Sequence, residues 1–501
     1  MSTHARRLVG FLWIAGGIAC SEAPGEPDGG ADAGQSARDA ASSDGSAPGA
    51  DAESADTSVA DAGGLDAGSD SGVGADALTS PDASSAGPGP GFSVAASSTV
   101  GSAASFGTDL SLALDERGAP MLAYVWEAPA GVAANGAVYF VRWSSDTQRW
   151  TEPVRVEIIG PVFTNAPLRH VSLSRDPSTG VLGIAYGRFN TRTPPRNELV
   201  YSVHLAISLD GGQTWSSELV SQRMDPDSGS EEAYAPVLVM RDGRSHLAYP
   251  QRWQHCSGGS NGACTGLWHV TRTGTTGAFQ RTLAPLLSGT SGVRMTSIAL
   301  ALDAQGDPGV AYFSNSDAPA APERNTTNLT FWRPGTAPVR VDDSRGVQND
   351  SPALSLAYQD NAPRIAADLV REQGRSYDVL LWSSADNATW TSSVAIPRDG
   401  GDIMSWYHSL AIRADGAMAL ASGSHATAGG PRSACSAPKL ARSSDGLQWT
   451  TCGMSRAELP SGTGGYVNAV FGPDGKLWVA FQHPESNSPA VGPGVVVWRE
   501  P

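Results

Sequence analysis

The chain has 501 residues and a formal net charge of −16, and only 17% of its residues are charged. Most of the acidic excess lies in residues 21–90, which carry many Asp and a single basic residue, Arg38. The rest of the chain is therefore close to charge balance. Net charge favours neither nucleic-acid binding nor a partner selected by charge.

Residues 1–20 start with a basic segment, continue through an apolar stretch and end in small residues before Cys20, which is the order of an export signal. The ending GIAC resembles the lipobox of bacterial lipoproteins. This resemblance implies lipidation of Cys20 and attachment to the bacterial cell envelope, and Ser21 favours the outer membrane. The protein would face the periplasm or the cell surface. The alternative is an ordinary signal peptide with a chance Cys.

Residues 21–90 consist almost entirely of Ala, Gly, Ser, Asp and Pro. Such a segment cannot bury enough apolar surface to offset the entropy of ordering the chain, so we expect a disordered linker. The folded domain is expected at residues 91–501. No second apolar run reaches the roughly 20 residues of a membrane-spanning helix, so the lipid anchor would be the membrane contact.

Four cysteines lie in the expected folded domain: Cys256, Cys264, Cys435 and Cys452. An even number in an exported chain favours two disulfides. Of the three connectivities, we expect the sequence-local pairs 256–264 and 435–452. The spacings are not the short paired ones of zinc sites, and we expect neither a metal nor a cofactor.

A unit of about sixty residues recurs along residues 91–501. Each copy starts with two short apolar runs joined by a turn such as Asp-Gly or Asp-x-x-Gly, which supplies the backbone angles of a hairpin. The seven hairpins begin at Leu110, Val171, Pro236, Ser297, Ala353, Ser409 and Asn468. A third alternating run follows each hairpin, and a fourth follows in the first six copies.

Four strands per copy and almost no helical periodicity predict an all-β fold, a seven-bladed β-propeller. Six or eight blades remain open if one hairpin is misread. The seventh copy stops after its third strand. We expect residues 91–99, GFSVAASST, to supply the missing outer strand and to close the ring.

Between the third and fourth runs of the second copy stands SLDGGQTW, with Ser208, Asp210, Gly212 and Trp215 at the positions of a Ser-x-Asp-x-Gly-x-Thr-Trp motif. Shorter relatives are SSDTQRW at 144–150 and SSDGLQW at 443–449, and SSADNATW at 383–390 has its Asp displaced by one place. This motif resembles the Asp-box, or BNR repeat, of sialidase-type propellers. We expect a structural turn, because the motif recurs in several blades; a catalytic or metal-binding Asp210 is the alternative.

In such a propeller, the ends of second strands and the starts of first strands meet on the face opposite the Asp-box turns. Residues of that face are rich in Arg, His and aromatic rings, which recognise sugars and carboxylates. The candidate ligand-binding residues are Arg169, His170, Arg188, Tyr234, Gln251, Arg252, Trp253, Arg294, Trp406, Tyr407, His408, Tyr466 and His483. The alternative is that these side chains only fill the central channel.

The family resemblance implies a test for catalysis, because a sialidase uses three Arg, a Tyr paired with Glu, and an acid/base Asp. Arg169, Arg188, Arg252 and Arg294 could supply the Arg, and Tyr234 lies near Glu231 and Glu232. However, the Arg-Ile-Pro element is absent, and family enzymes have six blades. We therefore expect a monomeric, non-catalytic propeller that binds a glycan or an envelope protein. A sialidase-like hydrolase and a structural module of the envelope are the alternatives.

Overall fold

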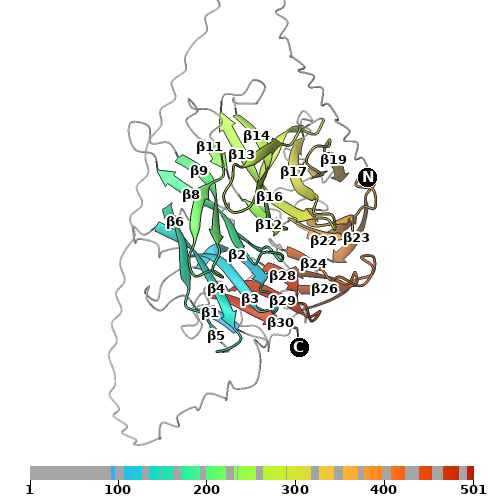
Figure 1. Cartoon of the computed structure of the whole chain (residues 1–501). Coiled ribbons are helices and arrows are strands. Elements are labelled where there is room, and N and C mark those ends of the chain that lie inside the picture. The colour runs from blue at the N-terminus through green and yellow to red at the C-terminus, as the bar shows by residue number, and fades with distance from the viewer. Residues whose placement is uncertain are drawn as a thin grey trace, which may run out of the picture. The chain divides into compact units, whose positions relative to one another are not determined.

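The structure is a computed structural model that describes residues 92–95, 106–126, 135–147, 149–161, 171–191, 199–221, 231–233, 235–254, 263–288, 290–316, 327–342, 354–370, 377–397, 408–423, 439–453, 467–483 and 494–500. These residues form strands and turns, and the strands form the seven blades of a β-propeller around a central axis (Figure 1). The all-β fold and the blade number predicted from the sequence are confirmed. No described segment forms a helix long and apolar enough to cross a lipid bilayer.

Each blade is a sheet of four antiparallel strands. The first strand lies nearest the central axis and the fourth lies outermost. Blade 1 has β2 (Phe106–Leu114), β3 (Pro120–Trp126), β4 (Asn135–Ser144) and β6 (Val154–Pro161), with the short β5 (Arg149–Trp150) also paired to β4. Blade 2 has β7 (Val171–Arg175), β8 (Leu182–Thr191), β9 (Leu199–Ser208) and β10 (Ser216–Leu219). Blade 3 has β12 (Val237–Arg241), β13 (Arg244–Gln254), β14 (Ala263–Thr273) and β15 (Gln280–Leu283).

The next three blades have the same strand order. Blade 4 has β16 (Thr290–Leu302), β17 (Pro308–Ser316), β18 (Thr327–Trp332) and β19 (Val339–Asp342). Blade 5 has β20 (Leu354–Gln359), β21 (Ala362–Val370), β22 (Tyr377–Ser383) and β23 (Thr391–Ile396). Blade 6 has β24 (His408–Ile412), β25 (Met418–Ser422), β26 (Lys439–Ser443) and β27 (Thr450–Gly453).

Blade 7 joins the two ends of the folded chain. It has β28 (Val467–Phe471), β29 (Leu477–His483), β30 (Gly494–Arg499) and, as its outermost strand, β1 (Phe92–Ala95). The antiparallel register places Phe92 opposite Val497 and Ala95 opposite Gly494. The predicted closure of the ring by residues just before the first copy is confirmed, and it leaves no gap in the seventh sheet.

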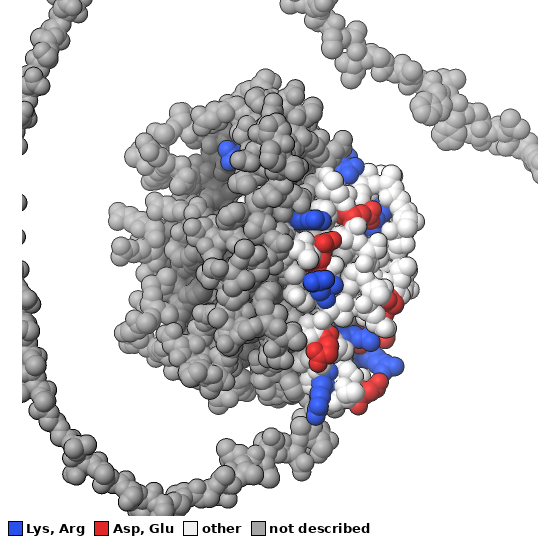
Figure 2. Space-filling view, turned by 90° about the vertical axis from the view of Figure 1, so that its left-hand side faces the viewer, with Lys and Arg blue, Asp and Glu red and all other residues white. Residues whose placement is uncertain are grey.

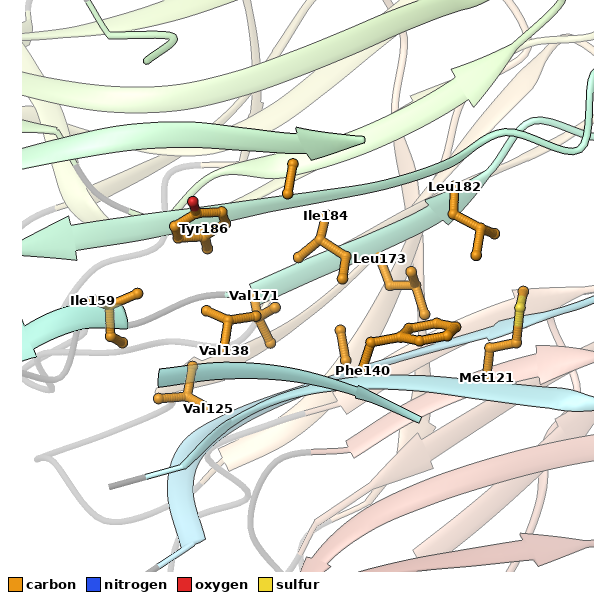
Figure 3. Close-up of a cluster of buried hydrophobic side chains, with 12 residues drawn as sticks. Met121, Val125, Val138, Phe140, Ile159, Val171, Leu173, Leu182, Ile184 and Tyr186 are labelled. Atoms are coloured by element: carbon orange, nitrogen blue, oxygen red, sulfur yellow. The ribbon is translucent and has the colours of Figure 1, made fainter. Parts of the chain in front are cut away.

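Apolar side chains fill all seven interfaces between neighbouring blades. Figure 3 shows the interface of blades 1 and 2, where Val138 and Phe140 point toward Leu173 and Ile184. A side chain of this size stabilises the fold by about 1.5–3 kcal/mol when it is fully buried. The alternation of apolar residues along each strand therefore serves two interfaces, one on each side of the blade.

Serine side chains join the innermost strands of several neighbouring blades. The Ser111 hydroxyl accepts a hydrogen bond from the Leu173 amide of the next blade at 2.9 Å. The same contact recurs around the ring, in Ser172–Leu238, Ser174–Met240, Ser355–Leu410 and Ser409–Ala469. An inner strand has one edge without a partner strand, so these hydroxyls satisfy amides that would otherwise be buried without an acceptor.

An additional strand, β11 (Glu231–Ala233), links blades 2 and 3. It pairs parallel with β9 and antiparallel with β13, so the two blades form one nine-stranded sheet. The sequence did not predict this strand, because the three residues EEA have no alternating pattern.

Candidate functional site

Strand direction defines two faces of the propeller. The turn face carries the turns from first to second strands and from third to fourth strands. The loop face carries the ends of the second strands and the starts of the first strands. It also carries the longer connections, from second to third strands and from one blade to the next. The predicted ligand-binding residues belong to the loop face.

The SLDGGQTW turn on the turn face is held together by its own side chains. One carboxylate oxygen of Asp210 accepts hydrogen bonds from the Gln213 and Thr214 amides, both at 2.9 Å, and from the Ser208 hydroxyl at 2.8 Å. The other oxygen accepts from the Thr214 hydroxyl at 2.6 Å. Hydrogen bonds from Thr214 and Ser208 hold the pKa of the Asp210 carboxyl well below its usual range. Both oxygens are thus used within the turn.

The same bonds form in shortened turns of blades 5 and 6. Asp386 accepts from the amides of Ala388 and Thr389, and Asp445 accepts from those of Leu447 and Gln448. The turn at 383–390 begins at Ser384, whose hydroxyl donates to Asp386 at 3.1 Å, so its Asp is in register and the displacement read from the sequence is corrected. Asn387 there takes the positive φ that Gly446 takes in blade 6.

Gly212 and Trp215 fix this turn against blade 1. The Trp215 ring meets the Phe140 ring edge to face, with centroids 5.3 Å apart, and its Nε1 donates to the Gly212 carbonyl at 3.1 Å. A Cβ on Gly212 would lie 2.1 Å from Phe140, and the Gly212 φ is +93°. Glycine is therefore required there both by contact and by backbone conformation.

Arginines at the ends of innermost strands connect the turn face of one blade to that of a neighbour. Arg241 donates to the carbonyls of Asp303 and Ala304 at 2.8 and 3.0 Å, and Arg413 donates to the Gly475 carbonyl at 3.2 Å. Figure 2 shows Lys and Arg interspersed with Asp and Glu on the described surface, rather than gathered by sign. Arg241 and Arg413 thus help to hold neighbouring blades together at the turn face.

On the loop face, β11 brings two predicted segments together at the junction of blades 2 and 3. Its register places Glu232 opposite Arg252 and Ala233 opposite Gln251 on β13, and Glu232 opposite Tyr201 on β9. Gln251 is buried and Arg252 is exposed. The strand that carries Arg252 is therefore paired on both sides, with β11 and with β14, and the exposed side chain projects from this fixed backbone.

Arg188 lies at the same end of β8, the second strand of blade 2, and is half-buried. Its carbonyl accepts a hydrogen bond from the Ser202 hydroxyl at 3.4 Å, and Ser202 also bonds the Nε2 of His204 at 3.0 Å. Burial, together with the nearby charge of Arg188, lowers the pKa of His204 to about 4. His204 is therefore neutral near pH 7, and Arg188 supplies the positive charge of this corner.

The backbone between β11 and β12 is strained at Ala235. Its φ is +43°, in the left-handed region that non-glycine residues rarely adopt, and its side chain is buried. Such strain persists only where the surroundings enforce it, and it concentrates at functional sites. Ala235 directly follows Tyr234, which lies outside the described residues.

Blade 4 carries a third predicted arginine, Arg294, in an irregular part of β16. The pairing of β16 with β17 shifts between Val293 and Ile298, and Arg294 lies within that shift. Just before it, a Cβ on Gly292 would lie 2.3 Å from the Thr265 hydroxyl of blade 3. The starts of β16 and β14 thus meet at the junction of blades 3 and 4. The Arg294 side chain itself is outside the description.

His408, a predicted surface residue, is buried instead. It starts β24, and its Nε2 donates to the Ala366 carbonyl of blade 5 at 3.0 Å. Burial lowers the pKa of the imidazole to about 4. The sequence pattern located the strand end correctly but could not show that this side chain turns toward the neighbouring blade.

Other predicted residues lie outside the described part of the chain: Arg169, His170, Tyr234, Trp406, Tyr407 and Tyr466. Trp253 and His483 lie at the loop-face ends of β13 and β29, without a described side chain. Cys20, Cys256 and Cys435 are also outside the description. Cys264 and Cys452 lie in blades 3 and 6, which are not neighbours, so a bridge between these two does not fit the ring. The local pairs stay a prediction.

Arg364-Ile365, the part of the chain most similar to the absent Arg-Ile-Pro element, lies at the turn-face end of its blade, away from the predicted ligand-binding residues. Arg364 is close to the start of β21 and donates to the Gln359 side chain at 2.9 Å, on the turn-face side. Among the described residues, no group of three or more His, Cys, Asp or Glu is arranged to hold a metal ion.

No family model matches the sequence, and no curated protein matches it. Solved structures resemble its fold at low sequence identity. A Dyadobacter fermentans protein of unknown function is 13% identical with a TM-score of 0.44, over 80% of this chain and 95% of that chain. Trypanosoma rangeli sialidase with the inhibitor DANA is 12% identical with a TM-score of 0.40, over 71% and 56%. A leech intramolecular trans-sialidase is 11% identical with a TM-score of 0.40, over 82% and 94%.

Proposed function

We propose that the protein is an exported, lipid-anchored propeller of the bacterial cell envelope that binds a carboxylate-bearing glycan on its loop face without cleaving it. The observation that carries this proposal is the junction of blades 2 and 3. Arg252 stands near the loop-face end of β13, which β11 joins to blade 2. Arg188 lies at the same end of β8, and the strand registers place its side chain on the other side of this shared sheet. A guanidinium offers two parallel donors to one carboxylate, which suits recognition of an acidic sugar.

The junction has the qualities of a binding surface rather than of a general scaffold. The exposed Arg252 is set on a fixed backbone, the strained Ala235 follows the segment that contains Glu231 and Glu232, and buried Gln251 underlies it. A rigid support reduces the entropy lost when a ligand binds. On the turn face, by contrast, the carboxylates of Asp210, Asp386 and Asp445 bond within their own turns.

The test is a glycan array probed with purified residues 91–501, with sialylated and uronic-acid oligosaccharides beside neutral ones. We expect retention of acidic glycans, and a loss of about tenfold or more in affinity in an Arg252→Ala variant, because a charged hydrogen-bonded pair is lost. Arg155→Ala is the matched control, since it removes an exposed arginine of blade 1 with the same change in net charge. An array with no acidic glycan retained would overturn the proposal.

The sialidase-like alternative rests on Tyr234 beside Glu231 and Glu232 at the same junction. It is decided by incubating the purified domain with fluorogenic sialosides. Turnover that Arg252→Ala abolishes would replace binding with catalysis. Specific capture of an envelope protein, with no glycan bound, would instead favour the structural alternative.

A further inference from the structure

Opposite charges stand on the two sides of the interface between blades 1 and 2, near its loop-face end. Arg188 is two residues beyond Tyr186 on β8, and Tyr186 is buried in this interface, so both side chains point toward blade 1. Glu157 on β6 lies opposite Val138, which points toward blade 2. Figure 3 shows Tyr186 at the same end of this interface as Ile159, which is also on β6. A basic and an acidic side chain thus meet at one junction.

These two charges are not paired with each other or with another described side chain. In the described part of the chain, the Arg188 guanidinium forms no hydrogen bond or ion pair. Glu157 uses its Oε1, which accepts a hydrogen bond from the Ile158 amide at 3.0 Å, and this local bond leaves Oε2 available. Both side chains are half-buried, so solvent still reaches them. Charges that are partly removed from water are costly to leave unpaired, which favours a partner from outside the chain.

The phenol of Tyr186 shows that the two charges lie close to the same point. Burial raises the pKa of Tyr186, the Ser217 hydrogen bond lowers it, the Glu157 carboxylate raises it and the Arg188 guanidinium lowers it. Both charges therefore act on one ring. The Tyr186 hydroxyl is hydrogen-bonded to the Ser217 hydroxyl, so the ring is a fixed, neutral part of the junction.

Blade 1 does not completely cover the outer strand of blade 2 beside these charges. Tyr186 lies opposite His204, and His204 lies opposite Leu219 on β10, so these side chains share the side of the sheet that faces blade 1. Tyr186 is fully buried, whereas Leu219 is 55% exposed. The junction thus offers a guanidinium, a carboxylate and an apolar contact, and solvent reaches all three.

This combination selects a ligand that carries both charges. A ligand with a carboxylate alone would be attracted to Arg188 and repelled by Glu157, and a ligand with an ammonium alone would meet the reverse. A zwitterion satisfies both groups, because a guanidinium donates two parallel hydrogen bonds to a carboxylate and an ammonium donates to a carboxylate. The exposed Leu219 favours a ligand with an apolar body.

We propose that Arg188, Glu157 and Leu219 form a binding site for a zwitterionic α-amino acid with an apolar side chain. The ligand carboxylate accepts from Arg188, its ammonium donates to Glu157, and its side chain packs on Leu219. Arg188 and Arg252 lie on opposite sides of their shared sheet, so this site is separate from the proposed glycan site and does not rest on it.

The direct test compares three probes of similar shape on the full-length protein. They are leucine, isocaproate, which lacks the ammonium, and isoamylamine, which lacks the carboxylate. The leucine methyl groups of the protein are ¹³C-labelled, and Leu219→Ile assigns the Leu219 signals by their loss. We expect leucine to move these signals in a saturable way, and each single-charge probe to bind at least about tenfold more weakly, because one charged hydrogen bond is lost. No saturable change with leucine, or equal binding of the three probes, would overturn the proposal.

Variants separate a ligand contact from a structural role. We expect Arg188→Gln and Glu157→Gln each to lower leucine affinity by about tenfold, with a urea midpoint near that of the native protein, because neither side chain pairs with another described one. Glu157→Gln should also narrow the preference for leucine over isocaproate, since the repulsion of a lone carboxylate is removed. Unchanged leucine affinity in either variant would contradict the site. If a variant fails to fold, the comparison of probes on the native protein decides.

Two controls locate the site. Arg155→Gln changes a charge on the same strand as Glu157, but Arg155 is exposed and lies opposite Tyr139, which packs at the interface of blades 1 and 7. We expect it to leave leucine affinity unchanged. Arg252→Ala should also leave leucine affinity unchanged, even where it abolishes acidic-glycan binding. A loss of leucine binding in either control would place the amino acid elsewhere and overturn the proposal, whatever the fate of the glycan site.

Discussion

The turn face and the loop face are made from the same strands but hold their connections in different ways. On the turn face, Asp210, Asp386 and Asp445 repeat one set of hydrogen bonds, and the β12–β13 turn needs only the residues between Arg241 and Arg244. On the loop face, connections such as the one between Ser422 and Lys439 are longer and differ from blade to blade. Repetition therefore marks the scaffold, and variation marks the surface available for recognition.

The largest expected effect comes from Gly212→Ala on the turn face. The new methyl group would meet Phe140 and would hold an L residue at a φ of +93°, so we expect a loss of about 3 kcal/mol in the free energy of unfolding. Urea denaturation followed by tryptophan fluorescence measures it. Gly243→Ala is the control, because its φ is +71° and no atom lies within 4 Å of the new Cβ. Equal losses in the two variants would refute the role of the Phe140 contact.

The variants Arg252→Ala and Asp210→Ala should distinguish the role of the loop face in glycan binding from the role of the turn face in stability. We expect Arg252→Ala to weaken acidic-glycan binding by about tenfold and to leave the urea midpoint unchanged, because the side chain is exposed. We expect Asp210→Ala to lower the urea midpoint and to leave glycan binding unchanged, because its carboxylate bonds only its own turn. Binding isotherms and denaturation curves on the same samples check both. A loss of glycan affinity in Asp210→Ala would break the distinction between the faces.

Buried histidines should make the interfaces sensitive to mild acid. The pKa of His204 falls to about 4 on burial, whereas an unfolded His titrates near 6.5. As pH falls through this window, the unfolded chain takes up the proton first. The contribution of neutral His204 to the free energy of unfolding is therefore fully present above pH 6.5 and is lost as pH declines toward 4. We expect His204→Gln to reduce this decline by about 1 kcal/mol between pH 6.5 and 5, measured from urea midpoints at each pH. An unchanged slope would show that His204 takes up no extra proton on unfolding.

The smallest expected effect on glycan affinity is that of Ala235→Gly on the loop face. Glycine relieves the positive φ but gains freedom in the unfolded chain, and these effects nearly cancel, to within about 1 kcal/mol. Because the segment before it becomes less constrained, acidic-glycan affinity should fall by a few-fold. Calorimetric titration of both proteins measures this change. Unchanged affinity would show that the strain plays no part in binding.

The blades could be predicted from the sequence because their chemistry is local and repeated. Asp-Gly turns fix each hairpin within a few residues, and the two-residue alternation shows which side chains face the neighbouring blades. The serine that follows the first apolar residue of the repeat, as in Leu110-Ser111 and Val171-Ser172, is a detectable signal for the contacts between blades. A serine in a strand has no strong propensity signal of its own, so only its recurrence among the copies marks it.

The candidate site could be predicted only as a face. β11 forms through pairing with β9 and β13 on either side of it, and no local pattern in residues 231–233 encodes that choice. His408 was placed at the right strand end, but its burial depends on the carbonyl of Ala366 in another blade. Residues of this kind depend on contacts between segments far apart in the chain, which one sequence does not reveal.

The pairing of β1 with β30 has a consequence for the order of folding. Residues 92–95 find their partners at 494–497, so this contact spans nearly the whole domain and carries the highest loop-closure entropy in it. Blades 1 to 6 can form from neighbouring segments as each becomes available. The seventh must wait until the last strand of the chain has arrived, and until then the first strand has no sheet to join.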